Sequence, residues 1–358
     1  MNSSADPTSQ HIAVQHITSQ HRAAPNRKRG FRLAKAALFA AIGLAPAVAW
    51  AQSDPAGFST VIEAPPTIVG DDESIGSDTQ FNVSDGGMVG DNFSAGPTDQ
   101  TGMNIEVNVA GGNVGSDFDA NSGSVINVSG GDIGNDFTAL GGSSVNVSGG
   151  NFSEFTARSG STVNVSGGNV SDFSASGTST VSISGGTFAL GFGDFFAGVS
   201  AGGSVDISGG TFGDGFGAST GSDINISGGA FGSGVSLSNS DVELIGGEFI
   251  FNGSPVTGPV SLNSRGFLAG TLADGSVFVF TNDGSFGGFQ NDILGNVNLT
   301  TVALPSIDTT PITIGSSSDS APNGLRPGQS LTLEGLGSLD NSFSAIGGTL
   351  NVLSLIHI

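Results

Sequence analysis

Apolar and polar positions alternate in a repeating pattern between about residues 81 and 251 of this 358-residue chain. In the unit around Val145-Asn146-Val147 one polar residue separates two valines, so the valines lie on the same face of a β-strand. Equivalent pairs in other units are Val163/Val165, Val181/Ile183, Val205/Ile207, Ile224/Ile226 and Val242/Leu244. A unit this short cannot bury its own apolar side chains, so we expect this face to form a core by stacking on the next unit.

Two more apolar columns follow the strand in each unit. The second column comprises Val114, Ile133, Phe152, Val170, Phe188, Phe212, Phe231 and Phe249. The third column comprises Phe118, Phe137, Phe155, Phe173, Phe195 and Phe216. Because equivalent residues recur at matching positions, the columns predict one continuous apolar interior that consecutive units share.

A pair of glycines separates the strand from the second column. The first members of these pairs are Gly86, Gly111, Gly130, Gly149, Gly167, Gly185, Gly209, Gly228 and Gly246, at intervals of 18 to 25 residues. We expect a corner at each pair, where a positive φ or a close approach between backbones requires glycine. The units have neither the leucine framework of a leucine-rich repeat nor the 3.6-residue period of helical repeats. The pattern therefore predicts an all-β protein, a parallel β-helix of about nine coils.

The pattern divides the chain into six segments. They are an N-terminal extension with a signal peptide (1–51), a leader with an N-terminal cap (52–80), the β-solenoid (81–251), a β cap or spacer (252–330), the first coil of a second solenoid (331–352) and a short tail (353–358). Within the spacer, Gly270 to Phe280 predicts two strands around an Asp-Gly turn, and Leu294 to Leu304 predicts another strand.

The first segment has the parts of a secretory signal peptide. Basic residues at Arg27-Lys28-Arg29 precede an apolar run from Ala36 to Val48, and Ala49-Trp50-Ala51 provides a cleavage site. We expect cleavage after Ala51, export, and no transmembrane segment in the product. The alternative is a permanent membrane anchor, for which the run is short and contains Pro46.

The tail Leu353-Ser354-Leu355-Ile356-His357-Ile358 resembles a translated sequencing adapter. This resemblance predicts that the authentic reading frame was interrupted after Val352 and that the protein continues. The alternative is an ordinary apolar terminal strand.

Charge and composition exclude several functions. The formal net charge is −22, and from residue 52 onward 30 acidic residues face 3 basic ones, a net charge of −27. Such a chain repels nucleic-acid phosphates, whereas divalent cations are its natural counter-charges. The absence of cysteine excludes disulfides and thiolate chemistry. The high glycine content, 60 residues, would also suit a disordered chain, but regular apolar columns are not typical of disorder.

Acidic residues precede the third column in five units: Asp117, Asp136, Glu154, Asp172 and Asp194. Stacked in register, these carboxylates would lie ~4.8 Å apart and repel one another. Calcium would relieve the repulsion, because it takes several oxygen ligands. We therefore predict these five residues as a calcium ladder, with solvated acids that maintain solubility as the alternative.

Asparagines recur between the paired apolar residues of the strand, at Asn108, Asn127, Asn146, Asn164 and Asn225. Strand alternation places them outside, where stacked amides can hydrogen-bond from coil to coil, and we predict a structural ladder rather than a ligand-binding stripe. Candidate catalytic groups are few, because residues from 52 onward contain no Lys, Tyr, Cys or Trp and only His357. This excludes Ser-His-Asp and Cys-His systems, while an enzyme that uses carboxylates alone stays open.

The signal peptide together with Val-Asn-Val-Ser-Gly-Gly coils resembles the repetitive passenger regions of bacterial surface adhesins, the autotransporter and filamentous-haemagglutinin-like β-helices. The resemblance covers residues 81–251 and 331–352 and implies a protein secreted or held at the surface of a Gram-negative bacterium. It implies a non-enzymatic adhesin or structural stalk, with extracellular glycans, neighbouring cells or divalent cations as partners and no required cofactor. The alternatives are a β-helix polysaccharide lyase or hydrolase, and a protein that binds ice or mineral.

Overall fold

The computed structural model describes residues 57–353, apart from 190–197, 201, 214, 219–220, 233–234, 238–239, 262–265, 283–295, 317–318, 320–321, 323, 336 and 340–342. The predicted signal peptide and residues 354–358 of the tail lie outside the described residues. The described part contains strands and turns but no helix. It is a parallel β-solenoid, which confirms the predicted fold class.

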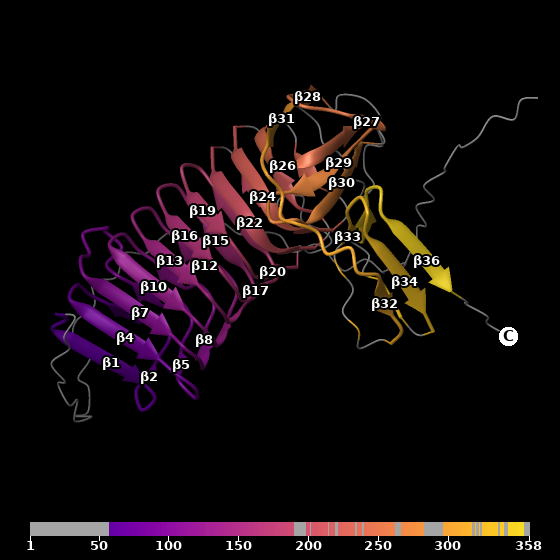
Figure 1. Ribbon diagram of the computed structural model, residues 1–358. Helices are drawn as coiled ribbons and strands as arrows, with labels where there is room; N and C mark the ends of the chain where they lie inside the picture. The colour runs from indigo at the N-terminus through magenta and orange to yellow at the C-terminus, as the bar shows by residue number, and fades with distance from the viewer. Residues whose placement is uncertain are drawn as a thin grey trace, which may run out of the picture. The chain divides into compact units, whose positions relative to one another are not determined.

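In the main stack, the coils up to β20 each contribute three strands, which pair in parallel with the equivalent strands of the neighbouring coils (Figure 1). In one central coil these are β13 (Ser144–Val147), β14 (Asn151–Phe152) and β15 (Phe155–Ala157). Asn146 of β13 pairs in register with Asn127 of the preceding coil and Asn164 of the following coil. Equivalent residues therefore stack on one another, as the repeat predicts.

The strands form three columns. The first column holds β1 (Thr60–Ala64), β4 (Thr79–Val83), β7 (Ile105–Val109), β10 (Ser124–Val128), β13, β16 (Thr162–Val165), β19 (Thr180–Ile183), β22 (Ser204–Phe212), β24 (Asp223–Phe231) and β26 (Asp241–Phe251). The second holds β2 (Ile68–Val69), β5 (Met88–Val89), β8 (Asn113–Val114), β11 (Asp132–Ile133), β14, β17 (Asn169–Val170) and β20 (Thr187–Phe188), and then continues within β22 and β24. The third holds β3 (Ser74–Ile75), β6 (Ser94–Ala95), β9 (Asp119–Ala120), β12 (Phe137–Ala139), β15, β18 (Phe173–Ser176), β21 (Gly198–Ser200), β23 (Gly217–Ala218) and β25 (Ser236–Leu237).

The predicted number of about nine coils is wrong, because the described chain makes about 13 turns. The first turn starts at Thr60 in β1, where Ala64-Pro65-Pro66 stands in place of the Val-Ser-Gly-Gly corner. Three further turns belong to a separate C-terminal stack. The first turn has no glycine pair, and the C-terminal stack has only one, Gly347-Gly348, for three turns. Counting coils by glycine pairs therefore gives too few.

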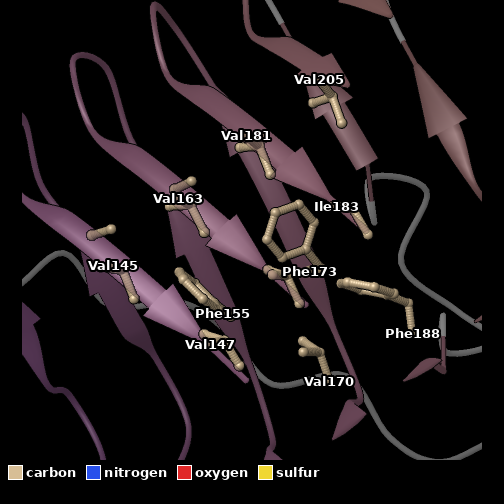
Figure 2. Close-up of a cluster of buried hydrophobic side chains, with 14 of the residues drawn as sticks. Val145, Val147, Phe155, Val163, Val170, Phe173, Val181, Ile183, Phe188 and Val205 are labelled. Carbon is tan, nitrogen blue, oxygen red and sulfur yellow. The ribbon is translucent and has the colours of Figure 1, made fainter. Parts of the chain in front are cut away.

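The predicted apolar columns form the core. Val145, Val163, Val181 and Val205 follow one another from coil to coil, with phenylalanines packed beside them (Figure 2). Ring centroids of Phe155 lie 4.9 Å from those of Phe137 and 5.6 Å from those of Phe173, both edge to face. The members of the second and third columns are buried except for Phe231, which is half-buried, and Phe195, which lies outside the described residues.

Most of the glycine pairs form corners, as predicted. In the seven pairs from Gly111-Gly112 to Gly228-Gly229 the second glycine has a positive φ, for example 87° at Gly150 and 89° at Gly168. In Gly86-Gly87 the first glycine has the positive φ, and Gly246-Gly247 has none and lies within β26. The first glycine packs against the coil below, because a Cβ at Gly149 would collide with the carbonyl oxygen of Ser129. A positive φ and a close backbone approach thus exclude other residues from two successive positions.

The last coil of the main stack is covered by the segment that follows it. Strands β29 (Gly266–Leu272) and β30 (Val277–Asn282) form the predicted antiparallel hairpin around an Asp-Gly turn. Strand β31 (Asn296–Thr301), also predicted, extends β26 in parallel, and β29 pairs with β26 antiparallel. The short strands β27 (Ser254–Pro255) and β28 (Val260–Ser261) pair with β26 and β31.

A second, shorter stack follows. Its strands β32 (Ile312–Ile314), β34 (Ser330–Glu334) and β36 (Thr349–Leu353) pair in parallel, as do β33 (Gly324–Leu325) and β35 (Ser344–Ala345). Ile314, Leu325 and Leu331 form its buried centre. The sequence predicts one coil at 331–352, whereas parallel pairing in the structure starts at Ile312.

Candidate functional site

The acidic residues predicted to bind calcium lie at the corner before the third column. Asp117 and Asp136 are exposed, with φ values of 60° and 58°. Glu154 and Asp172, in the next two coils, are half-buried. Asp194 lies outside the described residues.

The corner itself changes along this row. Three residues lie between Ile133 and Phe137, but only two lie between Phe152 and Phe155, so the corner is one residue shorter in the second of these coils. Within the described part of the chain, no group of three or more His, Cys, Asp or Glu side chains is placed to hold a metal ion. Calcium binding by the acidic row stays a prediction.

The predicted asparagine ladder is confirmed. Each side-chain amide nitrogen donates to the side-chain oxygen of the coil before it. The bonds are Asn108 to Asn82 (2.9 Å), Asn127 to Asn108 (2.9 Å), Asn146 to Asn127 (2.9 Å), Asn164 to Asn146 (3.0 Å) and Asn225 to Asp206 (2.8 Å). The ladder extends two residues beyond the prediction, because Asn82 accepts from Asn108 and itself donates to Glu63 at 2.9 Å.

A second polar row, not predicted from the sequence, lies just past the glycine corner. It consists of Asn113, Asp132, Asn151 and Asn169, all exposed. Asn151 Nδ2 donates to Asp132 Oδ1 at 2.8 Å, and Asn169 Nδ2 donates to Asn151 Oδ1 at 2.9 Å. The signal was present in the sequence, since Asn or Asp follows the glycine pair in four consecutive units.

A groove of about 470 Å³ runs along the corners of these coils. We call it the glycine groove. Its residues are Asp85, Gly111, Gly112, Asn113, Gly130, Gly131, Asp132, Gly150, Asn151, Gly168 and Asn169. Glycines from four coils supply backbone without side chains, and the second polar row supplies amides and a carboxylate. The groove therefore offers hydrogen-bonding groups at a regular spacing, one set per coil.

A smaller hollow of about 300 Å³ lies along the asparagine ladder, on the strand side of the same corners. Its residues are Asn127, Val128, Ser129, Asn146, Val147, Ser148, Asn164 and Ser166. The serine hydroxyls are engaged: Ser148 Oγ donates to the Val128 carbonyl at 3.4 Å, and Ser166 Oγ to the Val147 carbonyl at 3.3 Å. The polar side chains that line this hollow therefore already form hydrogen bonds between coils.

One glycine corner is occupied by another part of the chain. The Asp-Gly turn of the β29–β30 hairpin places Asp274 Oδ2 2.9 Å from the backbone nitrogen of Gly229, which donates to it. Gly229 is the second glycine of its pair, equivalent to Gly150 and Gly168. Asp274 Oδ1 accepts from the Ser276 backbone nitrogen at 2.8 Å, which fixes the carboxylate. A glycine corner in this protein thus binds a ligand-like oxygen atom.

No model of a known protein family, no curated protein and no solved structure matches this chain. The fold places the chain among parallel β-solenoids, a class that includes both adhesins and enzymes acting on polysaccharides. Among the described residues, no helix is long and apolar enough to span a membrane.

Proposed function

We propose that this chain is an exported, non-enzymatic surface or extracellular-matrix protein that acts as an adhesin or structural stalk. The observation that carries the proposal is the register of its outward side chains. Asn127, Asn146 and Asn164 occupy the same position in consecutive coils, and Asp132, Asn151 and Asn169 do so across the corner. Identical weak contacts repeated along one surface add by multivalency, without a single strong site.

The chemistry of the surface supports binding more than turnover. From residue 52 to the end of the described chain there is no His, Lys, Cys or Tyr, so acid-base and nucleophilic roles would fall to Asp and Glu alone. The predicted signal peptide supports export, and the net charge of −22 favours glycans, cell surfaces or divalent cations over nucleic acid as partners.

The test is retention of the purified full chain on immobilised neutral and acidic polysaccharides, with an assay for new chain ends in the same samples. Binding without new ends is the expected result. Release of new ends that is abolished by one substitution such as Asp132→Asn would instead establish a polysaccharide lyase or hydrolase that uses carboxylates.

A further inference from the structure

The floor of the glycine groove carries backbone donors that the fold does not use. Among the described residues, the backbone nitrogens of Gly131, Gly150 and Gly168 donate no hydrogen bond to another backbone group. These glycines are half-exposed. The equivalent nitrogen of Gly229 donates to the Asp274 carboxylate, so an oxygen atom fits this position when one is presented. The free corners are therefore suited to accept an oxygen of a ligand.

The wall of the groove has both donors and acceptors. Asn151 donates one amide hydrogen to Asp132 and accepts one bond from Asn169. Each amide has two hydrogens and an oxygen with two lone pairs, so each retains capacity for a further partner. Hydroxyl groups, which both donate and accept, match such a wall, whereas an apolar or aromatic ligand finds no apolar side chain among the lining residues.

The charges of the groove select against anions. Asp85 and Asp132 line it, and no Lys or Arg does. A polymer that carries a carboxylate on every unit would bring its charges close to both residues, and an uncharged polymer avoids this repulsion.

The spacing selects a linear polymer. Coils repeat at ~4.8 Å, which is close to the length of one sugar unit in an extended glycan. The lining residues come from four coils and from Asp85 of the coil before them, so about four sugar units fit along the groove.

We propose that the glycine groove binds a linear, uncharged glycan that runs along the stacking direction, with about one sugar unit per coil. The proposal rests on the proposed function and adds its site and ligand class. Sugar oxygens accept from the second-glycine nitrogens, and sugar hydroxyls bond with Asn151, Asn169 and Asp132.

The test measures binding of uncharged hexasaccharides of β-1,4-linked glucose, mannose and N-acetylglucosamine, with hexagalacturonate as the charged probe, to the full chain by calorimetry. The double variant Asn151→Ala/Asn169→Ala should bind the preferred uncharged probe about tenfold more weakly or worse. The matched control is Asn135→Ala, an exposed asparagine at the next corner. Asp132→Asn should strengthen binding of hexagalacturonate. Circular dichroism and urea midpoints confirm that each variant folds.

The outcomes separate this inference from the function on which it rests. Equal binding by wild type, the double variant and the control would overturn the groove as the site and leave an adhesive function standing. Preference for hexagalacturonate, or no binding of any hexasaccharide, would overturn the ligand class. Cleavage of a bound hexasaccharide would overturn the non-enzymatic function itself.

Discussion

The side-chain nitrogen of Asn146 lies 2.9 Å from Oδ1 of Asn127, and Asn164 repeats the same contact with Asn146 at 3.0 Å. Asn146 therefore takes part in two ladder bonds, whereas Asn164 takes part in one, because Ser182 stands at the ladder position of the next coil. Asn146→Ala should lower the free energy of unfolding by about 1–3 kcal/mol, and Asn164→Ala by about half as much, since a hydrogen bond contributes about 0.5–1.5 kcal/mol net. Urea unfolding measures both free energies. Equal losses for the two variants would contradict a ladder in which each hydrogen bond contributes independently to stability.

Alanine at either position of a glycine pair should destabilise the protein, for a different reason at each position. Gly149→Ala places a Cβ against the Ser129 carbonyl oxygen, and Gly150→Ala keeps a φ of 87° with a Cβ 3.1 Å from the Gly130 oxygen. We expect each to destabilise by about 1–3 kcal/mol, from overpacking in the first case and left-handed strain in the second. Gly76→Ala is the matched control, because it has open space and no positive φ. Thermal unfolding of the three variants should separate the corner glycines from the control.

Truncation of Phe155 should create a cavity that destabilises only its own coil and the neighbouring coils. Phe155 is fully buried and its ring contacts Phe137, Phe152 and Phe173. Phe155→Ala should cost about 3–5 kcal/mol. Because coils contact only their neighbours, amide exchange should accelerate in β12, β15 and β18 and stay unchanged in β24. Met103→Ala, at a side chain 71% exposed, should change neither quantity.

The two stacks are joined by a buried arginine. Arg326 Nε lies 3.4 Å from Glu248 Oε2, and its Nη1 donates to the Pro305 carbonyl at 2.8 Å. Glu248→Ala leaves a guanidinium, 9% exposed, without its carboxylate, which we expect to cost about 2 kcal/mol. Cleavage by proteases between residues 302 and 311 should then accelerate. Glu334→Ala, which removes an exposed acid of the same stack, should leave the cleavage rate unchanged.

Periodicity explains what could be predicted from the sequence. The valine and phenylalanine columns, the glycine corners and the asparagine ladder each recur at equivalent positions of the repeat. Because the coils stack in register, residues at equivalent positions contact one another. The number of coils could not be counted this way, because the turn at Ala64-Pro65-Pro66 has no glycine pair and the C-terminal stack has only Gly347-Gly348 for its three turns.

Contacts outside the repeat were not predictable in the same way. Asp274 reaches Gly229 across 45 residues, and Arg326 reaches Glu248 across 78. Neither pair belongs to a recurring pattern, and each depends on how a non-repeating segment folds back onto the last coils. The glycine groove was predictable only in part. The residues that line it recur in the sequence, but its hollow shape follows only from the geometry of the corners.

Asp119 in β9 should make the stability of the protein depend on pH. Burial raises the pKa of its carboxyl above the ordinary value of 3.8, the positive charge of Arg158 opposes this, and the negative charge of Asp117 adds to it. A raised pKa in the folded state means that folding disfavours the ionised form. The unfolded chain therefore binds fewer protons than the folded chain between 3.8 and the raised pKa, and this carboxyl's contribution to stability falls as the pH rises through that window. Asp119→Asn should stabilise the protein at pH 7 and have no effect below 3.8, whereas Arg158→Ala should destabilise it at pH 7 only. Urea midpoints measured from pH 3 to pH 7 would check both signs, and a benefit of Asp119→Asn that is the same at every pH would show that its charge is not the cause.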